Sequence, residues 1–194
     1  EGAWYRITVL VALALGLLSK SVAIVLPGIL ALLLWLQERR QLRHEARLFA
    51  GMGAICGAYL LMVQRFVRTA ALEAPVRPYP EHLFTQLKAL VFYLDLLVWP
   101  SALSVDHQFL VSDSWGEPLV LGAGGLVGSL LYLAWRARRQ QPLYAVCLGA
   151  ALLALSPASL VPLNVLVNEH RLYLASAFLA LVTGLWMGSA RRRP

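Results

Sequence analysis

The sequence carries little charge for its length. Of its 194 residues, 14% are charged and 59% are hydrophobic, whereas soluble domains have about 25% charged and about 45–50% apolar residues. So few charged side chains cannot cover a surface exposed to water, which excludes an ordinary soluble domain. The composition predicts an integral membrane protein.

Acidic residues and lysines are also scarce. The chain has 17 basic and 10 acidic residues, a formal net charge of +7, and only Lys20 and Lys88 among the basic residues are lysines. The arginines lie in short clusters between apolar runs, without the interleaved aromatic residues of a nucleic-acid surface, so no nucleic acid is expected as a partner. The preference for arginine is typical of a GC-rich bacterial genome and indicates the bacterial inner membrane.

Cysteine is limited to Cys56 and Cys147, both inside apolar runs. Neither belongs to a CxxC pair or has a histidine nearby in sequence, which excludes a disulfide framework and a cysteine-based metal site. The chain begins at Glu1, almost directly in an apolar segment, without a signal-peptide pattern. We therefore expect it to be part of a longer protein.

Six apolar segments approach the roughly 20 residues that a helix needs to cross a bilayer. They cover, approximately, residues 4–18, 21–36, 48–64, 119–135, 143–155 and 172–188. Several are short, which predicts tilted or broken helices packed against their neighbours. The expected fold is all-α: a polytopic transmembrane bundle of about six spans in a single membrane domain, residues 1–194, without a soluble repeat domain.

Arginine clusters predict the orientation, because basic residues accumulate in short cytoplasmic loops. The clusters are Arg39, Arg40, Arg43 and Arg47; Arg136, Arg138 and Arg139; and Arg191, Arg192 and Arg193. If all three are cytoplasmic, the chain between Arg65 and Pro118 begins and ends outside. Residues 83–99 then form an interfacial or re-entrant helix on the outer face. Its apolar side chains recur at helical spacing, and its polar residues Thr85, Gln86, Lys88 and Asp95 lie elsewhere around the helix.

With this topology the outer side collects acids, histidines, amides and cations, and we expect it to be the functional, periplasmic face. Lys20 lies between two apolar segments, where a cation is costly unless it snorkels or is paired. It is either a snorkelling interfacial lysine or a counter-ion for a phosphate held at the membrane surface.

Two further segments combine residues that are able to carry chemistry. Glu169, His170 and Arg171 follow one another at the start of an apolar span, and the alternatives are a ligand site or an ordinary helix start with Glu169 at its positive end. Asp106 and His107 are adjacent in an outer loop. They are either solvated, or transfer protons, or hold a divalent cation together with Asp113.

Three sequence blocks are informative together. They are Leu18-Ser19-Lys20 with Leu26-Pro27; Trp99-Pro100 with Leu103-Ser104-Val105-Asp106-His107; and Pro162-Leu163-Asn164 with Asn168-Glu169-His170-Arg171-Leu172-Tyr173-Leu174. In this order they resemble the membrane domains of the transmembrane and tetratricopeptide-repeat O-mannosyltransferases and their bacterial relatives. The resemblance covers roughly residues 4–186, and its last block is the most specific. Ser21 and Ala175 depart from the family pattern, which has an acidic residue and a proline there.

The resemblance implies a GT-C-like glycosyltransferase that moves a sugar from a polyprenyl-phosphate carrier to a protein or glycan acceptor. The chain would be the second half of its membrane domain. The family's catalytic carboxylate lies in an earlier loop, so no catalytic residue is assigned here. Apart from the divalent cation considered above, no cofactor is expected. The substrate-binding residues implied are Lys20, Asp106, His107, Asn168, Glu169, His170, Arg171 and Tyr173.

Two other functions fit the same residues. One is non-enzymatic, a membrane assembly subunit or half of a transporter, although a transporter is expected to carry ionisable residues near the midplane and inverted repeats. The other is a polymerase or ligase of lipid-linked polysaccharide, which would share the outer-face site.

Overall fold

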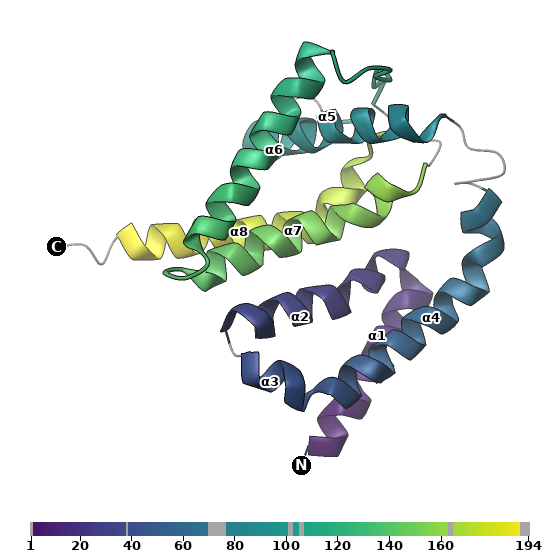
Figure 1. Cartoon of the computed structure of the whole chain (residues 1–194), viewed down its shortest axis with the longest axis vertical. Coiled ribbons are helices and arrows are strands. Elements are labelled where there is room, and N and C mark those ends of the chain that lie inside the picture. The colour runs from purple at the N-terminus through teal and green to yellow at the C-terminus, as the bar shows by residue number, and fades with distance from the viewer. Residues whose placement is uncertain are drawn as a thin grey trace. The chain divides into compact units, whose positions relative to one another are not determined.

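The computed structural model describes residues 2–37, 39–69, 77–100, 103–104, 107–162 and 165–190, and over this part the chain is helical, with no strand (Figure 1). The helices are α1 (Gly2–Ser19), η1 (Ser21–Val25), α2 (Leu26–Gln37), α3 (Arg39–His44), α4 (Ala46–Arg68), α5 (Tyr79–Val98), α6 (Pro118–Ala137), α7 (Pro142–Leu160), η3 (Glu169–Arg171) and α8 (Leu172–Ala190). The all-α prediction is confirmed. Proline lies within the first two positions of α5, α6 and α7, where its missing N–H has no helical partner to lose.

Among the residues described, four helices are long and apolar enough to cross a membrane: Ala46–Arg68, Pro118–Ala137, Pro142–Leu160 and Glu169–Gly188. Only 11% of the apolar window is buried within the protein for three of them, and 39% for Pro142–Leu160. Apolar surface left so exposed calls for a hydrocarbon solvent, which supports a membrane protein. Trp4–Ser19 and Ser21–Gln37 are shorter apolar helices, so a bundle of six spans stays a prediction.

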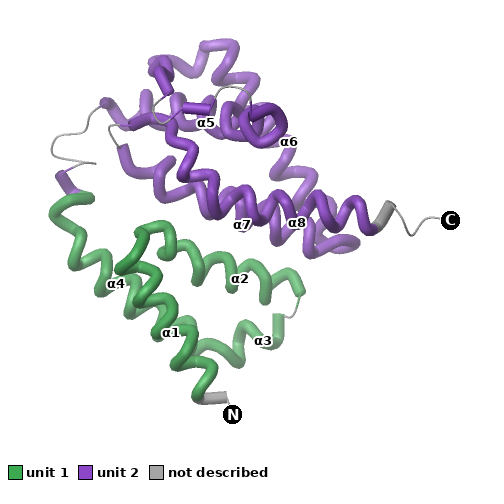
Figure 2. The backbone as a smooth tube through the Cα atoms, turned by 180° about the vertical axis from the view of Figure 1, so that it is seen from behind, with its two compact units in different colours: residues 1–67 green, residues 68–194 purple. Residues whose placement is uncertain are grey.

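The chain divides into two compact units, residues 1–67 and 68–194 (Figure 2). In the first unit, Leu13 and Leu17 of α1 pack with Ala23, Leu48 and Met52 in one apolar cluster. Close packing at this cluster is visible at Gly51, where an added Cβ would lie 3.0 Å from a methyl group of Leu10. The expectation of one membrane domain is not tested by this division.

The second unit is built around α7, which contacts α5, α6 and α8. Figure 1 shows α7 and α8 side by side and running in opposite directions. Its core joins Ala89, Tyr93 and Leu96 of α5 with small and aliphatic side chains of α7 and α8. Arg136 in the last turn of α6 and Arg138 at its C-cap come shortly before the start of α7, whereas the segment that leads to Glu169 follows the end of α7.

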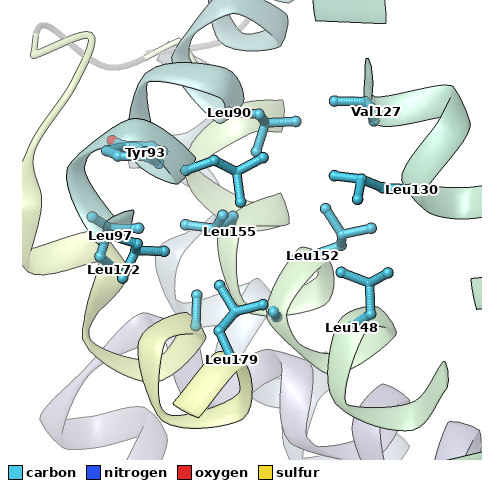
Figure 3. A pocket seen from close by; sticks show the side chains of 13 residues that line it. Leu90, Tyr93, Leu97, Val127, Leu130, Leu148, Leu152, Leu155, Leu172 and Leu179 are labelled. Atoms are coloured by element: carbon cyan, nitrogen blue, oxygen red, sulfur yellow. The ribbon is translucent and has the colours of Figure 1, made fainter. Parts of the chain in front are cut away.

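A small apolar cavity lies among these four helices (Figure 3). Its walls include Leu90 and Tyr93 of α5, Val127 of α6, Leu152 of α7 and Leu172 of α8. The C-terminal half of α5 therefore packs against the middle of α6 and α7. The expected helix at residues 83–99 is present as part of α5, but its position in the membrane, interfacial or re-entrant, stays a prediction.

Candidate functional site

One side of α5 holds the loop that follows it. The Thr85 hydroxyl accepts a hydrogen bond from the backbone N–H of Ser112 at 2.9 Å, and the Lys88 ammonium donates to the Leu110 carbonyl at 3.3 Å. The same ammonium pairs with Glu117 at 3.4 Å. These side chains lie three residues apart, on neighbouring turns of one helix face, and they fasten residues 107–117 as a strap along α5.

Aromatic side chains complete the strap. The ring of Phe84 lies 4.8 Å from that of Trp115 between centroids, and the ring of Phe92 lies 5.6 Å from Phe109 and 5.0 Å from His107. The strap therefore runs antiparallel to α5: Trp115, near the end of the strap, lies beside the N-terminal part of α5, and His107, at the beginning of the strap, lies beside Phe92. This contact sets the level of the His107 imidazole along the helix.

A neighbouring side of α5 holds the segment that leads into α8. The Gln86 amide donates to the Leu166 carbonyl at 3.1 Å. The Tyr93 hydroxyl accepts from the backbone N–H of Asn168 at 3.0 Å and donates to its carbonyl at 3.4 Å. Segments far apart in sequence are thus fixed on adjacent faces of one helix, since His107 meets Phe92 and Asn168 meets Tyr93.

Arg171 strengthens this attachment from the other side. Its guanidinium donates to the carbonyl of Leu166 at 2.9 Å and to that of Val165 at 2.8 Å. The Asn168 side chain accepts from the backbone N–H of His170 at 3.1 Å and caps η3. Both contacts are local, so the turn that presents Glu169 is rigidly defined by its own sequence as well as by α5.

The two segments meet at Glu169 and His107. His107 Nε2 lies 2.9 Å from Glu169 Oε1, and the backbone N–H of Ser104 donates to the same oxygen. The His107 side chain is only 10% exposed and the Glu169 side chain 28%. A partly buried carboxylate joined to an imidazole can orient that ring, hold a proton, or bind a polar ligand at its open side.

A second polar pair is buried at the start of α5. The Arg77 guanidinium lies 3.1 Å from His82 Nδ1, and His82 is 1% exposed. Burial lowers the pKa of His82 most, and the charge of Arg77 lowers it further. The Ser159 backbone opposes these effects, and the charge of Arg171 adds a smaller lowering. The ring is therefore held neutral, as an acceptor for Arg77.

The residues predicted as a site are only partly brought together. His107 and Glu169 meet directly, and Asn168 and Arg171 shape the turn that carries Glu169. His170 and Tyr173 are exposed, Tyr173 at 84%. Asp106 lies outside the described residues.

Lys20 belongs to the first unit and has no described relation to this pair. Its backbone is extended, between α1 and η1, and its side chain is exposed. The backbone N–H of Lys20 donates to the Gly16 carbonyl at 2.8 Å, and its carbonyl accepts from Ala23 at 3.0 Å. That Lys20 binds the same substrate as Glu169 and Arg171, as the resemblance implies, stays a prediction.

The polar residues of α5 were not recognised as part of the site. The pattern of apolar residues placed Thr85, Gln86 and Lys88 away from the apolar face of the helix, yet Thr85 and Gln86 are 0% and 3% exposed. They are buried because two loops of the same protein cover them. The sequence did contain a signal for these contacts, because the polar residues are clustered in one half of an otherwise apolar helix.

Within the residues that the structure describes, no group of three or more histidine, cysteine, aspartate or glutamate side chains is arranged to hold a metal ion. The suggested cation site includes Asp106, which lies outside these residues. Comparison with protein families, with curated proteins and with solved structures finds no match.

Proposed function

We propose that the protein is part of a membrane glycosyltransferase that transfers a sugar from a polyprenyl-phosphate carrier to a hydroxyl acceptor on the outer face. The observation that carries the proposal is the Glu169–His107 pair, at 2.9 Å, assembled from two segments that lie 62 residues apart in sequence. Each of these segments belongs to a block that resembles one enzyme family. A carboxylate and an imidazole in contact supply groups that a hydroxyl acceptor needs.

The surroundings of the pair suit a substrate with a hydrocarbon tail. Glu169 starts an apolar stretch long enough to cross a membrane, and Leu172, one turn further on, lines the apolar cavity together with Tyr93. A lipid-linked sugar would place its head group beside Glu169 and its hydrocarbon along the exposed apolar helices. A water-soluble nucleotide sugar would gain nothing from that surface.

Position along the helices supports a site on the outer side. Arg136 and Arg138 lie at the end of α6, just before α7 begins, and Glu169 follows the end of α7, so the pair and the arginines are at opposite ends of one candidate span. Basic loops mark the cytoplasmic side. The periplasm of a bacterial inner membrane is therefore the proposed location of the reaction.

A transfer assay tests the proposal. The full-length protein that contains this chain, purified in detergent, is supplied with a radiolabelled polyprenyl-phosphate sugar and, in separate reactions, with a protein, a glycan or a lipid-linked polysaccharide acceptor. Transfer to protein or glycan supports the proposal. Transfer to lipid-linked polysaccharide alone favours the polymerase or ligase function, and absence of both carrier binding and transfer contradicts an enzyme of this class.

A membrane assembly subunit is the second candidate, and a specific observation favours it. Arg171 donates to two backbone carbonyls, and Glu169 accepts from the Ser104 backbone, so both charged side chains hold their own protein together. In a subunit of this kind Glu169→Gln, which preserves the acceptor for Ser104, would retain assembly. In an enzyme the same change reduces transfer while the protein stays folded.

A further inference from the structure

A strongly basic segment connects α2 and α4 in the first unit (Figure 1). Between residues 39 and 47 the sequence contains four arginines and one acidic residue, Glu45. The four arginines are all exposed, and they are Arg39, Arg40, Arg43 and Arg47. The backbone N–H of Glu45 donates to the Gln41 carbonyl at 2.9 Å, which continues the helical spacing across the end of α3. Since Arg43 is three or four residues from each of the others, the guanidinium groups share one side of the helix.

The acidic residue of this segment is engaged by another helix. Glu45 accepts hydrogen bonds from Arg6 of α1, from Nε at 3.0 Å and from Nη2 at 3.3 Å. This pairing uses both carboxylate oxygens and balances the charge of Glu45. The four arginines keep their combined positive charge, and those spaced four residues apart repel one another. A counter-ion from outside the segment would relieve that repulsion.

Aromatic residues place these arginines at the depth of lipid head groups. The Arg39 guanidinium lies 5.1 Å from the centre of the Trp35 ring, in the last turn of α2, and Arg39 Nε donates to the Trp35 carbonyl at 3.3 Å. The Tyr5 ring lies beside Arg6, 5.8 Å from its guanidinium. Tryptophan and tyrosine are enriched where a membrane meets water. The candidate span Ala46–Arg68 begins in the same segment.

We propose that this basic face, formed by Arg39, Arg40, Arg43 and Arg47, binds the phosphate groups of anionic phospholipids in the surrounding leaflet. A guanidinium donates two parallel hydrogen bonds to a phosphate, which suits arginine to this ligand. Basic segments next to a membrane span attract anionic lipids, because the lipids hold negative charge at the surface. The acyl chains would lie along the exposed apolar side of α4. This binding is independent of the proposed transfer reaction.

Bound lipid should also stabilise the fold. A helix as short as α3 (Arg39–His44) is not stable by itself, and repulsion between its arginines weakens it further. Phosphate groups on the basic face would offset that repulsion. A ligand that binds only the folded protein raises the melting temperature, so anionic lipid should protect the protein against heat more than neutral lipid does.

Lipid binding to the full-length protein that contains this chain tests the proposal. The protein is purified in neutral detergent, and native mass spectrometry measures its affinity for phosphatidylglycerol and for phosphatidylcholine. A double variant, Arg40→Gln with Arg43→Gln, is compared with Arg65→Gln with Arg68→Gln, which removes the same charge from exposed positions at the other end of α4. The first variant should bind phosphatidylglycerol about tenfold more weakly and phosphatidylcholine as the wild type does. The second should keep the wild-type preference.

Melting temperatures give a second readout. Without added lipid both variants should melt as the wild type does, and phosphatidylglycerol should then stabilise the wild type more than Arg40→Gln with Arg43→Gln. Equal affinity of the wild type for the two lipids, or an unchanged preference in that variant, would overturn the inference. Displacement of phosphatidylglycerol by inorganic phosphate at the same concentration would also overturn it, by showing a site for free phosphate. Because no sugar substrate is present, these results do not depend on the transferase proposal.

Discussion

The candidate site depends on a few side chains that bind backbone atoms. Tyr93, Gln86 and Arg171 each hold the segment between Val165 and Asn168. Backbone carbonyls in a partly buried segment need donors, and losing one costs the desolvation of the remaining group. These residues therefore position Glu169 without any need to touch a substrate.

Arg171→Ala separates the two roles considered for this arginine. Because its guanidinium shares the Leu166 carbonyl with Gln86 and donates to the Val165 carbonyl in an exposed contact, we expect the substitution to destabilise the protein by about 0.5–1.5 kcal/mol, the net contribution of an intramolecular hydrogen bond. The melting temperature in detergent measures this loss of stability, and the transfer rate is measured on the same samples. Arg65→Ala, a substitution of an exposed arginine in α4, is the control. A lost transfer activity at unchanged melting temperature would instead support direct binding of phosphate.

His82 should make stability depend on pH in a defined window. Its pKa in the folded protein is below the ordinary value of 6.5, chiefly through burial, so the unfolded chain takes up a proton more readily. The stability that the neutral His82 ring contributes is therefore fully present above pH 6.5, and it is lost as the pH decreases through the pKa of the folded protein. His82→Gln keeps an acceptor for Arg77 but does not titrate.

Melting temperatures at pH 7 and pH 5 test this expectation. The wild type should lose more stability over this interval than His82→Gln, while His44→Gln should behave as the wild type. An equal loss in all three proteins would show that other groups cause the acid sensitivity.

At the scale of elements, α5 organises the second unit. Its residues Thr85 and Lys88 fasten the strap, its residues Gln86 and Tyr93 fasten the segment before α8, and its apolar side chains enter the core. One helix thus determines the distance between His107 and Glu169.

Lys88→Met should release the strap. The substitution removes the contacts to Leu110 and Glu117 and keeps the length of the side chain. We expect faster cleavage by chymotrypsin at Phe109 and Leu110 under native conditions, because local opening becomes easier. Asp95→Asn, an exposed change on the same helix, is the control, and equal cleavage of both variants would show that Lys88 does not hold the strap.

Packing of α4 in the first unit can be tested with a matched pair of glycines. A Cβ at Gly51 would lie 3.0 Å from Leu10, whereas at Gly53 nothing lies within 4 Å. Gly51→Val and Gly53→Val change helix propensity equally, so their difference reports the contact. We expect Gly51→Val to be less stable by about 1–3 kcal/mol, the usual cost of overpacking, as measured by unfolding in mixed detergent.

At the scale of the whole molecule, the exposed apolar side chains are the dominant feature. They extend over four candidate spans, and this distribution is stable in lipid but not in water. The arginine clusters predict which loops are cytoplasmic, and chemical labelling can test that prediction.

Cysteine labelling of intact cells tests the position of α5. The introduced cysteines must be accessible to the reagent. Gln86 and Ser112 are unsuitable positions because they are buried in the protein, whereas Leu83 is 40% exposed and Trp99 is 70% exposed. With Cys56 and Cys147 replaced by alanine, Leu83→Cys and Trp99→Cys should both label from the outside. Gln140→Cys should label only after lysis, and labelling of the two ends of α5 from opposite sides would show that it crosses.

The sequence by itself determined the class of structure and the helices. Where charge is scarce and apolar runs are long, helices in lipid satisfy the backbone. Each expected apolar segment is accordingly helical, although residues 21–36 are divided into η1 and α2, and the all-helical fold is confirmed. These properties are local, because they depend on composition and on the periodicity of neighbouring residues.

Tertiary structure alone decided which polar residues meet. It joined His107 to Glu169 and buried Thr85 and Gln86 beneath two loops, although the helical pattern of α5 placed its polar side chains away from its apolar face. Periodicity distinguishes one face of a helix from another but cannot say whether water or another part of the chain covers it. Contacts over 62 residues of sequence depend on how loops fold back onto α5, and that is decided by packing and by the need of buried backbone groups for partners.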